Sequence, residues 1–100
     1  MNMQLMIKQA QKMQSDILKS KEEINQKIFP GKYSYLEIEI NGKKEIIKVT
    51  IDKSLKISDE EDVEMLEDVI ALALKDAITK VDKETEEKLG KYGSGMSGLL

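Results

Sequence analysis

The stretch EIEINGKKEIIKVTID, at residues 37–52, places an Asn-Gly pair between two segments in which apolar and polar residues alternate. Alternation with a period of two is typical of a strand with one buried face, and Asn-Gly favours a two-residue type I′ turn. The pattern predicts an antiparallel hairpin of strands 33–40 and 43–51, in which Leu36 lies opposite Ile47. One face of the hairpin is then apolar and the other carries mixed charges.

A Pro-Gly pair precedes this hairpin. Pro30-Gly31 suits the two central positions of a type II turn, so we expect a first short strand at 27–29 to pair with strand 33–40. The two turns together predict a three-stranded antiparallel sheet. Tyr33 and Tyr35 would share one face of it, where they can either stack nucleic-acid bases or pack against a lysine side chain; Glu residues in the same row favour packing.

Residues 3–27 form a predicted amphipathic helix, because apolar residues recur every three or four positions. This stripe consists of Met3, Met6, Ala10, Met13, Ile17, Ser20 and Ile24, of which only Ser20 is polar. Near the opposite side lies a basic strip, defined here as Lys8, Lys12 and Lys19, that spans roughly 16 Å of helix. The Met-rich stripe is interpreted as core or dimer seam, with a peptide-binding groove as the alternative. The basic strip is either a solvated face or a contact for phosphates.

A second helix is expected from about residue 59 to residue 90, with Ser58 and Glu61 at capping-box spacing. Its apolar residues spread over two flanks, which is wider than a three-stranded sheet needs, so a second chain is expected to cover one flank. After Val81 no apolar residue follows until Leu89, and this part of the helix is predicted to be an arm in solvent. The main stripe consists of Val63, Leu66, Ile70, Ala73, Leu74, Ala77 and Val81, and the second flank of Met65, Val69 and Leu72.

Length and composition bound the function. One hundred residues predict a single domain, at 1–90, followed by a flexible Gly/Ser-rich tail at 91–100. The chain has neither His nor Cys, which argues against an enzyme, a cofactor or a metal site. The acidic residues 59–64 lack the spacing of a calcium loop and are interpreted as helix-capping. The longest apolar run is six residues and the start is not signal-like, so we expect no membrane association and a cytoplasmic location.

Charge is unevenly distributed along the chain. The net charge is −3, yet residues 1–57 carry eleven Lys against seven acids, a net of +4, and residues 58–100 carry five Lys against twelve acids, a net of −7. All sixteen basic residues are Lys. Because Lys suits phosphate while Arg reads guanine edges, any DNA contact is expected to involve little base readout.

Four blocks of the sequence, in order over about residues 3–99, resemble the YbaB/EbfC family of bacterial nucleoid-associated proteins: LMIKQAQKMQ, INGKKEIIKVTID, EMLEDVIALALKDA and EKLGKYGSGMSGL. The resemblance implies an α+β fold with an α-β-β-β-α protomer, and a tight, layered homodimer with projecting helical arms. It also implies a non-enzymatic protein that binds DNA with low sequence preference, sometimes beside replication or recombination proteins. The chain departs from many relatives in its short FPGKYSY segment, in Lys75-Asp76-Ala77, and in lacking Arg.

The sequence therefore predicts a homodimeric, nucleoid-associated protein that contacts the phosphates of double-stranded DNA. The expected contacts are the basic strip and then Lys83, Lys88 and Lys91 near the end of the second helix, where acids oppose them. The expected core and dimer residues are Met6, Met13, Ile17, Leu36, Ile47, Leu66 and Ile70. The alternative is an acidic adaptor or chaperone-like factor of DNA replication or repair, whose contact with DNA is indirect.

Overall fold

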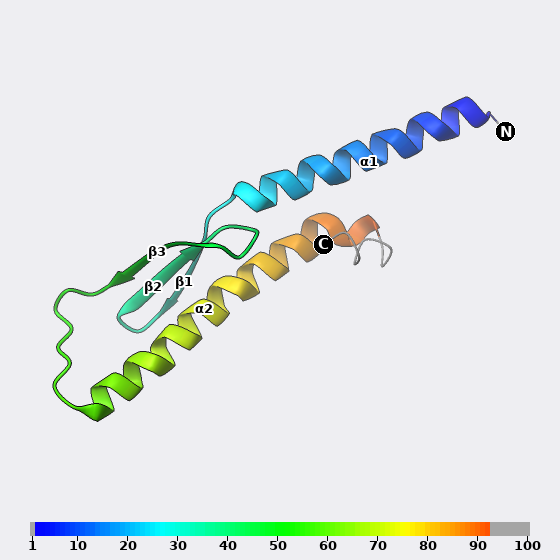
Figure 1. Cartoon of the computed structure of the whole chain (residues 1–100). Coiled ribbons are helices and arrows are strands. Elements are labelled where there is room, and N and C mark those ends of the chain that lie inside the picture. Colours follow the sequence, from blue (N-terminus) through cyan, green and yellow to red (C-terminus); the bar gives the residue numbers. More distant parts are fainter. Residues whose placement is uncertain (1, 93–100) are drawn as a thin grey trace.

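The computed structural model describes residues 2–92 and contains two long helices that flank a small sheet (Figure 1). The order of elements confirms the predicted α-β-β-β-α protomer and its α+β class. A short 3₁₀ helix, η1, ends the described part. The bounds are α1 Met3–Gln26, β1 Phe29–Tyr33, β2 Leu36–Ile40, β3 Ile46–Ile51, α2 Glu60–Leu89 and η1 Gly90–Tyr92. Segment 93–100, nearly all of the predicted tail, lies outside the described residues.

The first hairpin differs from the prediction at its turn. Pro30 and Gly31 lie within β1, where they pair with Glu39 and Ile38 of β2, and the chain reverses at Ser34 and the residue after it. Pro30 is tolerated because β1 is an outer strand of the order β1-β2-β3. The predicted type II turn is therefore wrong, and the first strand is 29–33 rather than 27–29.

The second hairpin is antiparallel as predicted, but its register is different. Leu36 pairs with Ile51 and not with Ile47, and β3 begins at Ile46 because the connection is longer than two residues. A type I′ turn needs positive φ at both central residues. Asn41 does not adopt it; the positive φ, 65°, is found at Lys44. The side chain of Asn41 instead accepts hydrogen bonds from the amides of residues 43 and 45, which holds a wider loop.

The core lies between α2 and the first two strands. Apolar residues at every second position of β2 face α2, and small or branched residues at every fourth position of α2 face the sheet. Gly31 of β1 allows close approach, since a Cβ there would lie 2.1 Å from the carbonyl oxygen of Ala73. The buried residues are Ile17, Ile24, Phe29, Leu36, Ile38, Ile40, Val69, Ala73, Ala77, Val81 and Leu89.

The start of α2 is capped one residue later than predicted. Asp59 is the N-cap, and its carboxylate accepts a hydrogen bond from the amide of Asp62 at 3.0 Å. The backbone amide of Ser58 donates a hydrogen bond to the carboxylate of Asp62. The arrangement is therefore reciprocal, as in a capping box, but it joins Asp62 to Ser58 and Asp59 rather than Glu61 to Ser58.

The end of α2 is not an isolated arm, contrary to the prediction. Leu89 is 1% exposed and Glu84 forms an ion pair with Lys27, which follows α1. At this end of the molecule, the part that projects is instead the beginning of α1, where every residue from 3 to 16 is exposed and the helix continues past the end of α2 (Figure 1).

The seven expected core and dimer residues divide into two groups. Ile17 and Leu36 are buried, and Leu66 packs partly buried against the core. The other four lie outside the core of the single chain, with exposed fractions of 45, 51, 54 and 41%: Met6, Met13, Ile47 and Ile70.

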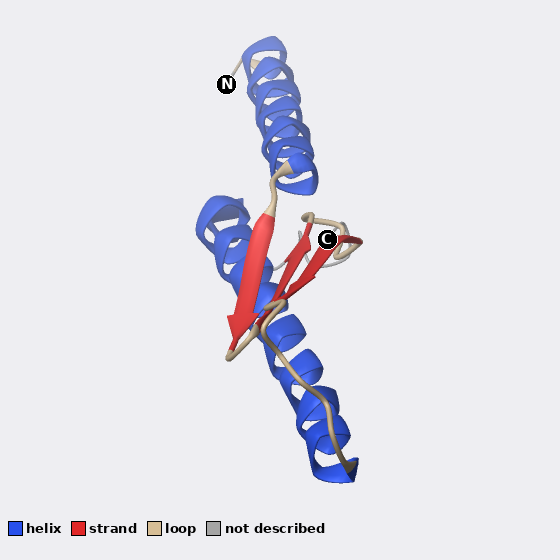
Figure 2. Cartoon of the chain, turned by 90° about the vertical axis from the view of Figure 1, so that its left-hand side faces the viewer, coloured by secondary structure: helices blue, strands red, loops and turns tan. Residues whose placement is uncertain are grey.

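The chain is elongated, with extents of 72 × 20 × 16 Å and a radius of gyration of 19.5 Å. Figure 2 shows the strands on one side of α2, with the first turns of α2 extending past the sheet in one direction and α1 in the other. No helix within residues 2–92 is long and apolar enough to cross a membrane.

Candidate nucleic-acid interface

The basic strip of α1 lies on the projecting helix. Asn2 caps the helix, its side chain accepting hydrogen bonds from the amides of Gln4 at 3.0 Å and Leu5 at 3.3 Å. Lys8, Lys12 and Lys19 are exposed. They lie within about 40° of one another around the helix, and about 150° from the buried Ile17 and Ile24.

Within residues 2–92, none of the three lysines of the basic strip forms an ion pair. Their positive charge is therefore directed to solvent. A free ammonium group is a donor for phosphate oxygens, so the chemistry of the strip is that of an anion contact.

The lysines near the end of α2 do not form a comparable strip. Lys83 and Lys88 are exposed but lie about 140° apart around the helix. Lys91 follows in η1, where its Nζ lies 5.2 Å from the centre of the Tyr92 ring. Lys83 and Lys88 therefore do not share one face of α2, which leaves the α1 strip as the better-organised basic surface.

Two of the acids expected to oppose DNA near this end of α2 are paired with lysines from other elements. Asp82 lies 3.1 Å from Nζ of Lys44, in the loop between β2 and β3. Glu84 lies 2.5 Å from Nζ of Lys27, between α1 and β1. The sequence reasoning missed both lysines, because the pairs join residues 38 and 57 positions apart and no local spacing indicates them.

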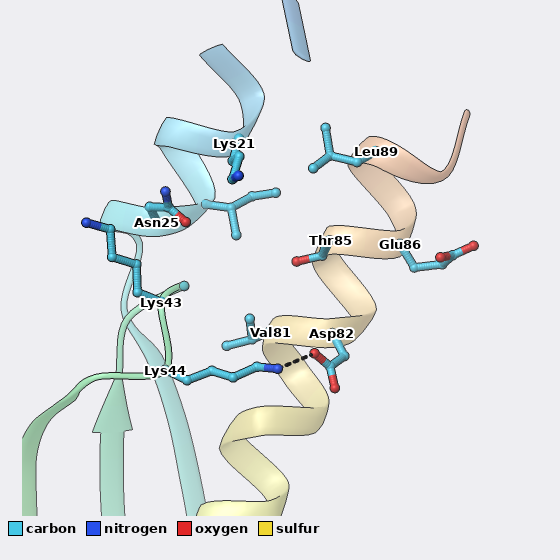
Figure 3. Close-up of a pocket in the computed structure, with 11 residues that line it drawn as sticks. Lys21, Asn25, Lys43, Lys44, Val81, Asp82, Thr85, Glu86 and Leu89 are labelled. Carbon is cyan, nitrogen blue, oxygen red and sulfur yellow. Dashed lines mark ion pairs between the residues drawn. The ribbon is translucent and has the colours of Figure 1, made fainter. Parts of the chain in front are cut away.

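A cleft of about 630 Å³ separates the end of α1 from the end of α2, with the β2–β3 loop at its base (Figure 3). Its apolar part is formed by Ile24, Val81 and Leu89. Charged and polar side chains surround it, and in Figure 3 the Lys44–Asp82 pair crosses its lower part. The remaining lining residues are Lys21, Asn25, Gly42, Lys43, Thr85 and Glu86.

Two carboxylates of the described residues have a pKa that local hydrogen bonds lower. The pKa of Asp52 is lowered by hydrogen bonds from the backbone and then the hydroxyl of Ser54. The pKa of Asp76 is lowered chiefly by a hydrogen bond from the Lys32 amide. Over residues 2–92 there is no cluster of three or more acidic side chains that would hold a metal ion.

A family model described as the YbaB/EbfC DNA-binding family matches residues 1–96. The chain belongs to this family. It is 40% identical to a protein of Enterococcus faecalis (strain ATCC 700802 / V583), over 98% of this chain and 94% of that protein. It is 36% identical to a protein of Ligilactobacillus salivarius (strain UCC118), over 99% of this chain and 95% of that protein. A protein of Lactococcus lactis subsp. cremoris (strain MG1363) is 39% identical, over 96% and 97%. Each of the three is named a nucleoid-associated protein.

The lysines of this YbaB/EbfC chain fall into two kinds in the structure. Lys8, Lys12 and Lys19 are exposed and lie together on α1. Lys27 and Lys44 instead pair with acids of α2, so their charge is compensated within the chain. Helical spacing alone identified the first kind, whereas only the tertiary structure reveals the second.

Proposed function

We propose that this protein is a homodimeric, non-enzymatic, DNA-binding protein of the bacterial nucleoid in the cytoplasm. It binds duplex DNA with low sequence specificity, mainly by phosphate contacts from Lys8, Lys12 and Lys19. Membership of a DNA-binding family and the names of the relatives support the nucleoid role. The observation that carries the proposed contact is the ion-pair-free basic strip on a projecting helix.

The shape of the protomer supports a dimer. A compact domain of 100 residues has a radius of gyration of about 13 Å, whereas that of this chain is 19.5 Å. The elongation arises because the first turns of α1 and of α2 extend in opposite directions from the sheet. Two copies side by side would give each projecting helix a neighbour.

The uncovered surface of β3 supports the same conclusion. Val49 and Ile51 pair with Ile38 and Leu36, so they share the face of the sheet that α2 covers over the neighbouring strand. Yet every residue of β3 is exposed. Large exposed apolar patches indicate interaction surfaces. This one suits the equally exposed apolar residues of a second copy, which on the helices include Met3, Leu5, Met6, Ile7, Met13, Leu18, Val63, Met65, Ile70 and Leu72.

The electrostatics favour phosphate contacts over base reading. Two copies carry a net charge of −6, so long-range attraction to DNA is absent and affinity must come from local strips. Without Arg, the chain lacks the planar guanidinium fork that reads guanine edges, and its lysines offer compact point charges that suit phosphate. Binding through lysines to phosphates releases counterions and weakens steeply as salt rises.

The test compares two triple variants with equal charge change. K8A/K12A/K19A removes the basic strip, whereas K48A/K53A/K56A removes three exposed lysines on and after β3. With a random-sequence duplex at about 50 mM salt, the first variant should lose at least about tenfold in affinity and the second should bind nearly as the wild type. Undiminished affinity of the first variant would refute the assignment.

The adaptor alternative keeps one specific observation in its favour. The projecting first turns of α2 are strongly acidic, and they lie at the end of the protomer opposite α1 (Figure 1). The acids are Glu60, Glu61, Asp62, Glu64, Glu67 and Asp68. Such a surface suits a basic protein partner, including replication or recombination proteins. Wild-type protein that binds duplex only at very high concentration, even at about 50 mM salt, would favour this function over direct DNA binding.

A further inference from the structure

The direction in which α1 projects depends on a small junction. Only Lys27 and Ile28 separate α1 from β1, and no residue of α1 before Ile17 is buried. Besides the core packing of Ile17 and Ile24, two polar contacts join this junction to other elements. The Gly42 amide donates to the Asn25 carbonyl at 3.2 Å, and Lys27 reaches α2 through Glu84.

We propose that the Lys27–Glu84 ion pair is a positioning pair, which sets the direction of α1 and thereby places the basic strip for contact with DNA. The proposal rests on the proposed function for its effect on DNA. Its structural part, the direction of α1, is independent of DNA. Neither residue is assigned a contact with DNA.

The burial of Glu84 distinguishes this pair from ordinary surface pairs. The Glu84 side chain is 18% exposed and that of Lys27 is 52% exposed, so the carboxylate is the desolvated partner; its Oε1 lies 2.5 Å from Nζ of Lys27. That Nζ also lies 5.6 Å from the centre of the buried Phe29 ring. The pair therefore joins α2, the end of α1 and the start of β1 at one point. A desolvated charge with one partner is strongly tied to that partner, because separation leaves the charge uncompensated.

The second oxygen of Glu84 adds to this argument. Its Oε2 is buried and has no hydrogen-bond partner among the described residues. Because this oxygen is turned away from solvent, the carboxylate depends on the contact of its Oε1 with Lys27 for charge compensation.

The Lys44–Asp82 pair provides a matched control. It lies two residues away on the same helix, it also joins α2 to another element, and its side chains are 47% and 63% exposed. Exposed pairs contribute little to holding a structure. Asp82→Asn and Glu84→Gln change the net charge equally, and each removes the acidic partner of one lysine.

An effect of charge alone and a positioning role predict opposite changes in DNA affinity for Glu84→Gln. If charge alone matters, both variants bind DNA more tightly than the wild type, because each removes an acid and frees a lysine. If Glu84 positions α1, Asp82→Asn still binds at least as tightly, but Glu84→Gln loses about tenfold in affinity. Fluorescence anisotropy with a labelled duplex at constant salt measures both.

A measurement without DNA follows the direction of α1. The chain has no Cys, so spin labels can be attached at Ser15→Cys on α1 and Thr79→Cys on α2, both exposed positions. Diluting labelled with unlabelled protein leaves only distances within one chain. The distance distribution should broaden or shift in Glu84→Gln and remain as in the wild type in Asp82→Asn.

The charge-reversed double variant K27E/E84K keeps the net charge and should regain both the narrow distribution and most of the affinity. The proposal is overturned if Glu84→Gln leaves the distribution unchanged, or if it tightens DNA binding as much as Asp82→Asn does. If the wild type itself does not bind duplex, the proposed function fails while the spin-label distances still decide the role of the pair.

Discussion

The carboxylate of Asp76 on α2 accepts a hydrogen bond from the backbone amide of Lys32 on β1, with 3.1 Å between Oδ2 and N. One turn later, Lys80 donates from Nζ to the carbonyl of Pro30 at 2.7 Å. Both backbone groups lie on the outer edge of β1, and Pro30 has no amide to offer there. Side chains of α2 and a proline thus close this edge of the sheet, which would otherwise be open to pairing.

Asp76→Ala should weaken the fold through this edge. Removing the acceptor leaves the Lys32 amide without its hydrogen-bond partner. It also removes the carboxylate oxygen that lies 3.4 Å from Nζ of Lys80. We expect the free energy of unfolding to fall by about 1 kcal/mol. Denaturant titration measures the loss, and amide hydrogen exchange should show faster exchange at Lys32. Thr79→Ala, on the same turn of α2, is the control and should leave exchange at Lys32 unchanged.

The contribution of Asp76 to the free energy of unfolding should depend on pH. Its pKa is held below the ordinary value of 3.8, chiefly by the hydrogen bond from Lys32, with Lys80 adding to the effect. The folded state therefore favours the ionised carboxylate, so the stabilisation is fully present above the unfolded pKa and is lost as the pH falls through the folded pKa. The difference in unfolding free energy between wild type and Asp76→Asn should shrink between about pH 5 and about pH 2. A constant difference over this range would contradict the assignment.

Gly31→Ala should be strongly destabilising, because the added Cβ would lie 2.1 Å from the Ala73 carbonyl and 2.6 Å from the Ala77 Cβ. These are atoms of the α2 helix and cannot move without separating it from β1. We expect a loss of about 3 kcal/mol or more. Gly90→Ala is the matched control, since its Cβ would meet only the flexible end of the Glu86 side chain at 3.0 Å. Similar thermal stabilities for the two variants would contradict this account of the β1–α2 contact.

The sequence predicted what depends on local pattern and missed what depends on distant contacts. Periodicity located both helices to within one or two residues, and alternation located the sheet. The Asn41-Gly42 pair was misread because Gly42 does not serve a two-residue turn; its lack of a Cβ lets the loop approach α1, where a Cβ would lie 2.0 Å from the Ile24 carbonyl. The ion pairs of Lys27 and Lys44 also depend on tertiary contacts that no local rule contains.

Val49→Asp should separate the proposed dimer more than it unfolds the chain. Val49 is 49% exposed in the protomer but lies on the face of the sheet that the partner is proposed to cover. A carboxylate buried there should raise the dimer dissociation constant by about 30-fold, or about 2 kcal/mol. Thr50→Asp, on the opposite face of the same strand, is the control. Light scattering over a concentration series measures both, and equal dissociation of the two variants would place the dimer surface elsewhere.

The slope of log DNA affinity against log salt concentration should be proportional to the number of basic-strip lysines that contact phosphates. If both strips of a dimer engage the duplex, six lysines contribute and the slope of log affinity against log salt is about −5.4. Lys12→Ala removes one lysine per strip, so the slope should become shallower by about 1.8, or by about 0.9 if only one strip engages. Lys53→Ala, which lies after β3, should leave the slope unchanged. Anisotropy titrations at several salt concentrations distinguish these values. Equal slopes for Lys12→Ala and the wild type would exclude α1 as the contact even if the protein binds DNA by another surface.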